Sequence, residues 1–532
     1  MAVATSDVPR LHQLVSQARK AHASVSKIVH LIEDAMSGTY HVRGYSERDH
    51  DMSLLSLRLG GRRLLYAFSW YAGIPSLRTL RRHASFTKLM PSFGFPREDE
   101  VIHNIQEIFV PKAKALATPD GPALHCTTGV SVLWDEISQE ETACYFPHAD
   151  TVGALCREHS WRVNLQLLTL ENAISIARAL WNGKVHFGKE ASVVAIASFG
   201  TRLRGAFPVL VSPTCKTKES TVLNAWKSVG ANLFGPVWSF ASDGDAGRRS
   251  MVYDMFMKYT VGPMHRLYQY LGGLPGLNLC TGEDDITADF DWKHEIKRIG
   301  RVFLTLDGFM IGDTLINFHT LRRYLLKSHT LEKVDRLLNP EDSQDVPRAI
   351  ELIEAVAGVR DLSDSVDSIQ DPSMLKEIAY IGVVGEMFLS FMDAFISVES
   401  SLTDQLISLS KFAHACFALF ERHGTNFMPN QLYGDMQTTV KNVFFCVAKQ
   451  LDLDPSQPLY LFNMGGHNPN FTYKQLLDRL AAAVDLDAIF TRNPELHTGF
   501  RRLKVNRKEQ LDHLNPESWN IRKNLIFPIM PI

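Results

Sequence analysis

The sequence lacks a disulfide framework. Its seven cysteines are odd in number and scattered through 532 residues, which fits mostly buried thiols in a reducing compartment. Cys144, Cys156 and His159 are of residue types that bind metals, but no CxxC motif accompanies them, so buried thiols are favoured over a zinc site. The chain also lacks an excess of charge. A formal net charge of -2 excludes a histone-like protein and confines any nucleic-acid contact to local basic surface.

Signals for export, membrane insertion and nucleotide binding are lacking too. Residues 1–10 carry Asp7 and no apolar segment, so we expect no signal peptide and a protein that is not secreted. The most apolar long window, residues 380–398, contains Glu386 and Asp393, which argues against a membrane span. The sequence has no internal repeat and no GxxxxGK[ST] loop, which excludes a repeat array and this kind of phosphate-binding loop.

What the sequence does have is apolar periodicity of two kinds. Residues 1–119 and 346–455 have helical spacing, whereas residues 120–345 mix strand-like and helical segments, and residues 456–532 form a C-terminal portion. We therefore predict an α/β core that follows a helical N-terminal region and is interrupted by an all-helical domain. Strands are expected at residues 130–137, 143–145, 151–155, 191–198, 206–211 and 237–242, the first three as a meander.

Two aspartates stand at strand-like segments in a way that suggests a site. Asp243 follows the apolar run Val237–Ser242, and Gly244 after it permits a sharp turn. Asp135 lies inside Ser131–Ile137, a segment that would otherwise be apolar. Ligand groups in open α/β sheets lie at the carboxyl ends of strands, and two such acids could share a metal ion. The alternative is that each acid only caps a helix or forms a turn.

Basic residues gather on two predicted helices downstream. In residues 284–299 several acids precede a helix, and the exposed side of that helix is expected to collect Lys293, Lys297, Arg298 and Arg301. Arg322 and Arg323 add a second basic strip. Such a mixture suits a site that holds metal and phosphate together. A charge-balanced surface helix with acids at its positive end explains the same pattern equally well.

Four stretches together resemble a known family. They are Leu133–Glu136, Ser242–Gly244, Asp289–Arg298 and the block Gly465–Asn470. In these stretches the chain resembles ribonuclease-H-like cut-and-paste DNA transposases of the P-element and THAP-associated type, in a version common among fungal hypothetical proteins. The resemblance covers most of residues 60–515. It implies a ribonuclease-H-like mixed sheet with a helical insertion, DNA as partner, and two aspartates and a glutamate that bind two divalent ions.

Within that resemblance, Asp135 and Asp243 match the two aspartates, and residues 346–455 match the helical insertion. The glutamate has no match, because residues 455–464 contain no acid where the family keeps it. The family's N-terminal zinc module is not expected either, since no Cys/His cluster precedes Cys126. The resemblance therefore implies a nuclear or cytoplasmic, transposase-derived protein, either a gene remnant or a repurposed copy, that associates with DNA and is catalytically impaired.

The missing glutamate leaves three hypotheses for the function. In the first, Asp135 and Asp243 bind one Mg²⁺ or Mn²⁺ weakly and no strand is cut, because two-metal chemistry needs a further acid. In the second, Glu421, Asp452 or Asp454 supplies the third ligand and the protein is an active transposase or nuclease. In the third, the chain is a helical interaction scaffold without nucleic-acid function. The sequence leaves oligomerisation open.

Overall fold

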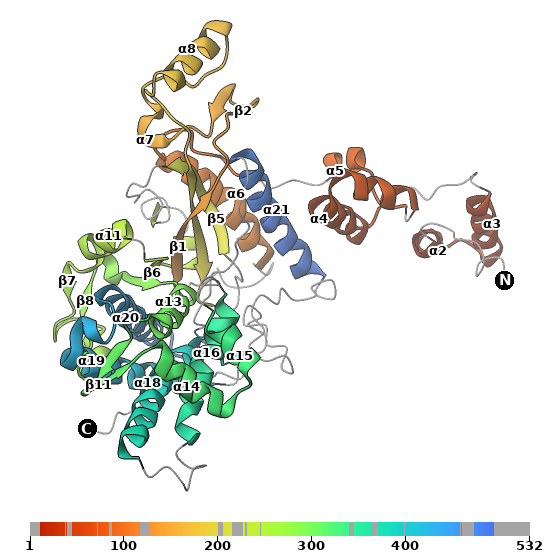
Figure 1. The fold of residues 1–532 in the computed structure, drawn as a ribbon. Coiled ribbons are helices and arrows are strands. Elements are labelled where there is room, and N and C mark those ends of the chain that lie inside the picture. Colours follow the sequence, from red (N-terminus) through yellow and green to blue (C-terminus); the bar gives the residue numbers. More distant parts are fainter. Residues whose placement is uncertain are drawn as a thin grey trace. The chain divides into compact units, whose positions relative to one another are not determined.

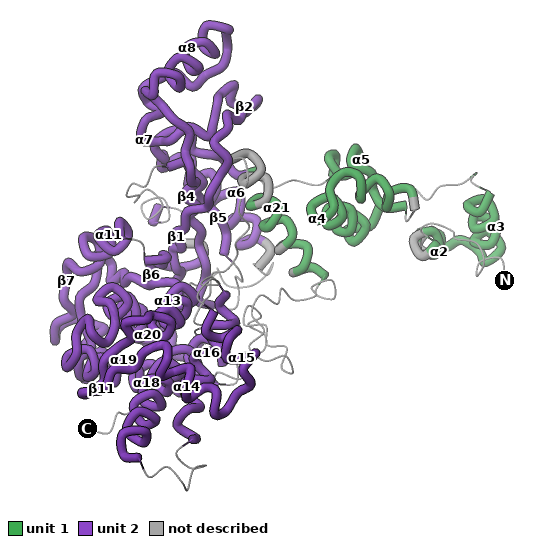
Figure 2. The backbone as a smooth tube through the Cα atoms, viewed as in Figure 1, with its two compact units in different colours: residues 1–88, 478–498 green, residues 89–477, 499–532 purple. Residues whose placement is uncertain are grey.

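The structure is a computed structural model of the 532-residue chain. It describes residues 11–37, 39, 45–71, 73–83, 88–116, 128–200, 206–214, 227–228, 231–244, 246–339, 345–362, 371–397, 400–457, 459 and 473–493. The chain divides into two compact units, residues 1–88 with 478–498 and residues 89–477 with 499–532 (Figure 2). The four domains predicted from the sequence follow a different criterion and stay a prediction.

Unit 1 joins helices from both ends of the sequence. Leu54, Leu65, Leu80 and Ile489 form its buried apolar cluster. Two ion pairs add to the contact between early and late helices, Arg58 with Asp485 and Arg492 with Asp51. Its helices are α2 (Leu11–Lys20), α3 (Val25–Met36), α4 (Glu47–Tyr71), α5 (Leu77–His83) and most of α21 (Tyr473–Arg492).

Unit 2 is built on a five-stranded mixed sheet (Figure 1). Its order is β5 (Ala206–Thr214), β4 (Glu190–Ser198), β1 (Val130–Ser138), β6 (Val237–Ser242) and β9 (Thr287–Phe290). β4 is antiparallel to β5 and β1, whereas β6 is parallel to β1 and β9. These strands are mostly buried, as expected for near-continuous apolar runs that are covered on both faces. The predicted mixed α/β class is confirmed.

Helices cover the sheet and continue into a large helical part. α6 packs on β5, where the Asn104 amide donates to the Val209 carbonyl and Phe109 meets Phe207 edge to face. α20 packs along β9 and β6. The helices of this unit are α6 (Glu98–Leu116), α7 (Arg157–Ser160), α8 (Leu170–Trp181), α10 (Ala231–Phe234), α11 (Ala246–Phe256), α12 (Tyr268–Leu271), α13 (Trp292–Leu304), α14 (Phe318–Ser328), α15 (Leu331–Leu337), α16 (Val346–Ala357), α18 (Pro372–Ile396), α19 (Leu402–His423) and α20 (Asn430–Leu453).

The most apolar helix, α18, lies in the core of the helical part. By length and composition it could cross a membrane, but 67% of its apolar window is buried inside the fold. It packs against α16 and α19, and the rings of Phe388 and Phe391 lie tilted against the ring of Phe412 of α19. Glycines at 382 and 385 allow this close approach, because a Cβ at Gly385 would lie 2.7 Å from the Val356 carbonyl carbon. α18 is thus accounted for as a core helix.

Residues 139–189 leave the sheet between β1 and β4 and form what we call the arm, which carries α8 at its outer end and α7 nearer the sheet in Figure 1. Its small core consists of Val152, Leu155, Ile176, Ala179 and Val185. The arm contains the hairpin β2 (Cys144–Phe146) and β3 (Thr151–Gly153). Two other short hairpins pair β7 (Tyr259–Thr260) with β8 (Cys280–Thr281), and β10 (Phe309–Ile311) with β11 (Thr314–Ile316).

Several sequence predictions need correction. The predicted meander is wrong, because β2 and β3 pair with each other while β1 pairs with β4 and β6. The helical spacing of residues 11–36 does not make one helix but two, since Ser24 caps the second one and His22 has a φ of 53°. Residues 287–290 form a strand that the run of acids obscured. The block Gly465–Asn470 lies outside the described residues.

We expect Gly385→Ala to destabilise the protein by about 1–3 kcal/mol, although alanine favours a helix over glycine, because the added methyl would overlap backbone atoms that cannot shift. The measurement is the urea midpoint of unfolding. Gly358→Ala is the matched control, since no atom lies within 4 Å of a Cβ there. Equal midpoints for the two variants would contradict the packing described for α18.

Candidate functional site

The register of β1 and β6 places the two predicted aspartates at equivalent positions. The strands are parallel, and Leu133 is the Cα partner of Ala241. Asp135 and Asp243 each follow these partners by two residues, so they lie at the same end of the sheet on neighbouring segments. Asp135 is still within β1, whereas Asp243 comes directly after β6. The backbone therefore brings together the two acids that the sequence singled out.

A buried arginine stands among these acids. Arg248, in the first turn of α11, forms ion pairs with both Asp243 and Glu136, and its side chain is only 5% exposed. Its guanidinium also lies over the Trp134 ring, 5.7 Å from the centroid. Burial lowers the pKa of Arg248 and the charge of Asp135 opposes that shift, yet an arginine remains protonated at neutral pH. We call the end of the sheet formed by Asp135, Glu136 and Asp243 the acidic edge. The protein itself supplies a cation there, the guanidinium of Arg248.

A second acid, Asp435 of α20, lies at the turn after β6. It is 2% exposed and receives two hydrogen bonds from Arg249, Nε at 2.8 Å and Nη2 at 2.7 Å. Arg298 Nη1 donates to the same carboxylate at 2.6 Å, and Arg298 Nη2 donates to the carbonyls of Asp243 and Gly244 at 3.1 and 3.2 Å. Arg298, which lies on α13, therefore links α20 to the turn that carries Asp243.

Glycine is required in that turn. Gly244 has a φ of 71°, a conformation that side chains rarely adopt. A Cβ there would also lie 2.9 Å from Asp435 Oδ2, which leaves no room for a larger residue. Sequence reasoning placed Gly244 correctly as a turn but gave no role to Asp435, Arg248 or Arg249. Asp435 stands in the middle of a long helix, where no motif draws attention to it.

The acids that were weighed as a third ligand have other surroundings. Asp452 pairs with Arg266, and Asp454 accepts a hydrogen bond of 2.6 Å from the Ser456 hydroxyl. Glu421 is exposed on α19. Two further acids that were not weighed lie in or beside the sheet: Glu295 is fully buried, and Asp289 is half-buried with its Oδ1 buried. Asp289 of β9 pairs in register with Ala241, and Glu295 of α13 accepts from Thr439 at 3.0 Å.

Burial perturbs both of these acids. Removal from water raises the pKa of Asp289 to about 7, and the charge of Asp291 adds to that shift. The pKa of Glu295 is raised well above its usual value, first by burial and then by the charges of Asp435 and Asp289. The protonated form is therefore favoured for Glu295, whereas Asp289 titrates near neutral pH.

The predicted basic residues divide into three settings. Lys293 is 8% exposed and lies near the Trp292 ring, so its predicted exposure is wrong. Lys297 is half-buried, and burial lowers its pKa while the charges of Asp291 and Asp135 oppose the shift. The remaining residues are engaged or exposed: Arg298 holds Asp435, Arg301 is exposed, Arg322 pairs with Asp335 and Arg323 pairs with Glu377.

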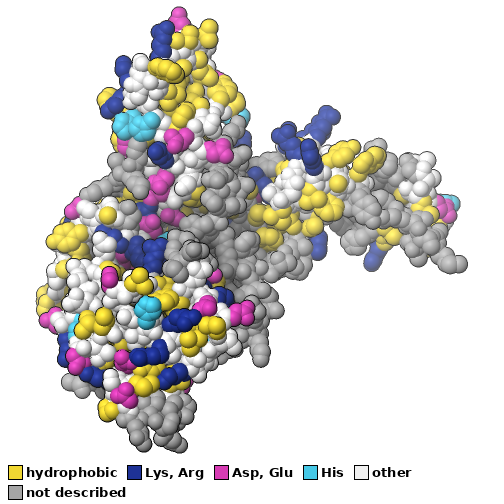
Figure 3. Space-filling view, viewed as in Figure 1, with side chains coloured by type: hydrophobic (Ala, Val, Ile, Leu, Met, Phe, Trp, Pro, Cys, Tyr) yellow, Lys and Arg dark blue, Asp and Glu magenta, His cyan; other side chains and the backbone are white. Residues whose placement is uncertain are grey.

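Figure 3 shows Lys and Arg side chains gathered over the region of β6 and α11, with Asp and Glu side chains close by. Asp291 contributes to this region from the start of α13, because its backbone N–H donates to the Ser242 carbonyl at 2.9 Å. Its carboxylate meets the His294 ring nitrogen at 2.8 Å. The surface beside the acidic edge is therefore of mixed charge rather than uniformly basic.

Comparisons with known proteins gave one similar structure. The fold is similar to a solved structure described as the Drosophila P element transposase strand transfer complex, with a TM-score of 0.49, 13% sequence identity and coverage of 96% of both chains. No family model matches the sequence, and no curated protein matches it.

We expect Asp289→Asn to stabilise the protein above neutral pH. The raised pKa means that the native state binds a proton that the unfolded chain releases, so native stability is lost as the pH rises from about 4 to about 7. The variant should match wild type near pH 4 and exceed it at pH 8 by about 1–3 kcal/mol in urea unfolding.

Asp307→Asn, at an exposed position, is the control and should show no such difference. A variant whose advantage over wild type did not grow with pH would contradict the burial of an ionisable Asp289.

Proposed function

We propose that the chain is a transposase-derived protein of ribonuclease-H-like fold that associates with DNA and is impaired as a nuclease. The observation that carries the impairment is the ion pairing of Arg248 with Glu136 and Asp243. The earlier reason, an acid-free stretch at residues 455–464, lies mostly outside the described residues. A nuclear or cytoplasmic location goes with this proposal.

The sheet supports the fold part of the proposal. β1 and β6 are the first and fourth strands of the five-stranded sheet in chain order, and they are neighbours. A ribonuclease-H-like sheet brings its first and fourth strands together in this way. The helices α16, α18, α19 and α20 follow the last strand of the sheet and include the segment taken as the insertion.

The acidic edge offers oxygen donors of the kind that Mg²⁺ and Mn²⁺ prefer. Asp135 and Asp243 would hold one such ion, and it would supply positive charge at a phosphate. The guanidinium of Arg248 competes for Asp243, however, and its burial makes displacement costly. Weak binding of a single ion is therefore expected. Loss of transition-state charge stabilisation of this kind lowers rates by orders of magnitude.

The competing function is an active metal-dependent transposase or nuclease, and Asp435 is the observation that favours it. Asp435 reaches the turn beside Asp243 and could serve as the third acid in place of the residues considered from the sequence. In the structure its charge is balanced by Arg249 and Arg298. An active site of this kind would need these arginines to turn toward a phosphate, so we rank it second.

We expect the purified protein not to nick or join DNA strands with Mg²⁺ or Mn²⁺, because Asp243 and Asp435, which would help to fix two cations, are paired with arginine. The assay follows nicking of supercoiled plasmid and joining of labelled oligonucleotides. Asp135→Ala and Asp243→Ala are run in parallel to identify contaminating nuclease.

Cleavage above background that disappears in both variants would overturn the proposal. Substitution of Asp435, and then of Glu421, Asp452 and Asp454 in turn, would identify the acid that completes the active centre.

We expect DNA binding that weakens steeply as salt rises, since lysine and arginine contacts to phosphates release counterions. A double Lys297→Ala, Arg301→Ala variant should bind random-sequence duplex more weakly, with a salt slope smaller by about one per lost phosphate contact. This variant leaves Arg298 in its ion pair with Asp435. Lys376→Ala, Lys411→Ala on α18 and α19 is the control with the same charge change.

If wild type shows no salt-dependent DNA binding, the hypothesis of a helical interaction scaffold without nucleic-acid function replaces the proposal. If the α13 variant binds like wild type, this face is ordinary solvated surface.

A further inference from the structure

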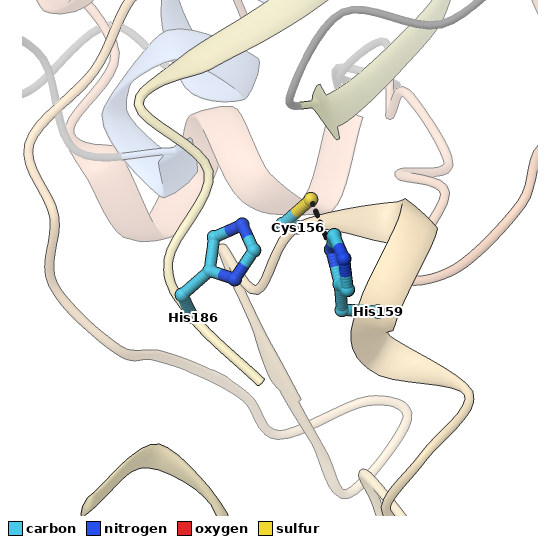
Figure 4. Close-up of side chains that lie close together, drawn as sticks. All are labelled: Cys156, His159 and His186. Carbon is cyan, nitrogen blue, oxygen red and sulfur yellow. Dashed lines mark hydrogen bonds between the residues drawn. The ribbon is translucent and has the colours of Figure 1, made fainter. Parts of the chain in front are cut away.

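A cysteine and two histidines come together in the arm. Cys156 stands immediately before α7, and His159 is one turn later on the same side of the chain. Cys156 Sγ lies 3.4 Å from His159 Nδ1, and the rings of His159 and His186 have centroids 4.4 Å apart. Figure 4 shows the three side chains converging, with Cys156 between the two rings.

The backbone holds His186 in this place. The segment before β4 runs antiparallel to the segment before α7, with a bridge between Leu155 and Phe187. The Cys156 N–H donates to the His186 carbonyl at 2.9 Å, and the Gly188 N–H donates to the Ala154 carbonyl at 2.9 Å. The three side chains therefore converge on a frame of backbone hydrogen bonds, and their placement does not depend on side-chain contacts alone.

We infer that Cys156, His159 and His186 bind a zinc ion. One ligand atom from each residue lies within 4.8 Å of the others. Around a tetrahedral zinc, with bonds of about 2.3 Å to sulfur and about 2.0–2.1 Å to nitrogen, ligand atoms are separated by roughly 3.3–3.8 Å, so small side-chain adjustments suffice. One thiolate with two imidazoles suits Zn²⁺, whereas Mg²⁺ prefers carboxylates and water.

Glu158 lies beside Cys156 but is not one of the residues whose ligand atoms all lie within 4.8 Å of one another. Its Oε2 lies 2.7 Å from Cys156 Sγ, which donates to it as a thiol. Its Oε1 accepts from the Thr214 hydroxyl at 2.8 Å and from Arg157 Nε at 3.1 Å. When zinc binds, the thiol proton passes to solvent and the zinc–sulfur bond replaces this hydrogen bond. Oε2 then no longer accepts from the thiol, while Thr214 and Arg157 still orient the carboxylate.

The ion would add to the backbone contacts that already join these parts of the chain. The ligands link α7 to the segment that enters β4, and Thr214 of β5 contacts Glu158. The apolar core of the arm is small, and domains with little core are commonly stabilised by a metal. This site and its role do not depend on the proposed function, because its ligands belong neither to the acidic edge nor to the basic faces.

The test uses Co²⁺ as a spectroscopic substitute for zinc. The full-length protein is purified with a reductant that does not bind metal ions. Wild type should bind a single Co²⁺ with a sulfur-to-cobalt charge-transfer band and the visible bands of tetrahedral cobalt, and Zn²⁺ should displace it. Cys156→Ser should abolish the charge-transfer band. His159→Asn and His186→Asn should each weaken Co²⁺ binding at least about tenfold, since even outer-shell partners contribute that much.

Cys144→Ser and His148→Asn are the matched controls, because both residues lie in the arm outside the cluster. Both should keep the wild-type spectrum and affinity. Circular dichroism of each variant distinguishes a lost ligand from a lost fold, and EDTA-treated wild type gives the metal-free folded reference. The absence of a charge-transfer band in folded wild type, or its persistence in Cys156→Ser, would overturn the inference and leave only a hydrogen-bonded cluster.

Discussion

The acidic edge of the sheet depends on one buried ion pair network, that of Arg248 with Glu136 and Asp243. Carboxylates gathered at the end of two parallel strands repel one another, and burial makes that repulsion costlier. A guanidinium removes the repulsion without an external ion. Breaking a buried pair by removing one partner typically costs about 3–5 kcal/mol, because the other charge is left uncompensated. The same arginine therefore stabilises the edge and competes with any divalent cation.

The surrounding charges extend this balance. Asp435 is neutralised by Arg249 and Arg298, and Lys297 is influenced by Asp135 and Asp291. A phosphate that binds these cations must compete with internal carboxylates, and a metal that binds these carboxylates must compete with internal cations. Under the proposed function, binding of DNA would therefore favour binding of a metal, because an arginine that turns toward a phosphate leaves an acid available to the metal. Whether this happens would decide between the impaired protein that we propose and an active one.

The sequence predicted the parts of this arrangement that are local. The strand Val237–Ser242 was predicted with its observed bounds, because a continuous apolar run ends at a turn that needs Gly244. The sequence also predicted, correctly, that Asp135 lies in a strand. The pairing of β1 with β6 rather than with β2 could not be predicted from spacing, since strand neighbours are set by the whole sheet.

Long-range contacts account for what was missed at the sites. Arg248 was visible as one more residue of a helix, and only the packing of α11 brings it to Glu136. Asp435 reaches the turn at Gly244 because α20 packs along β9 and β6. In the arm, Cys156 and His159 could be recognised from the sequence as neighbouring residues of metal-binding type. His186 is brought to them by a backbone bridge that no sequence motif predicts. Cys144, considered with them, is not part of that cluster.

The most direct test of the central claim is a Mn²⁺ titration of wild type and Arg248→Ala, followed by electron paramagnetic resonance. A unit charge at about 4 Å contributes roughly 4 kcal/mol at an effective dielectric constant of 20, so removing the guanidinium should tighten Mn²⁺ binding at least about tenfold. Adding Asp135→Ala to this variant should abolish the gain, and Lys376→Ala, with the same charge change on α18 away from these acids, should not reproduce it. Equal Mn²⁺ affinity in wild type and Arg248→Ala would contradict the account.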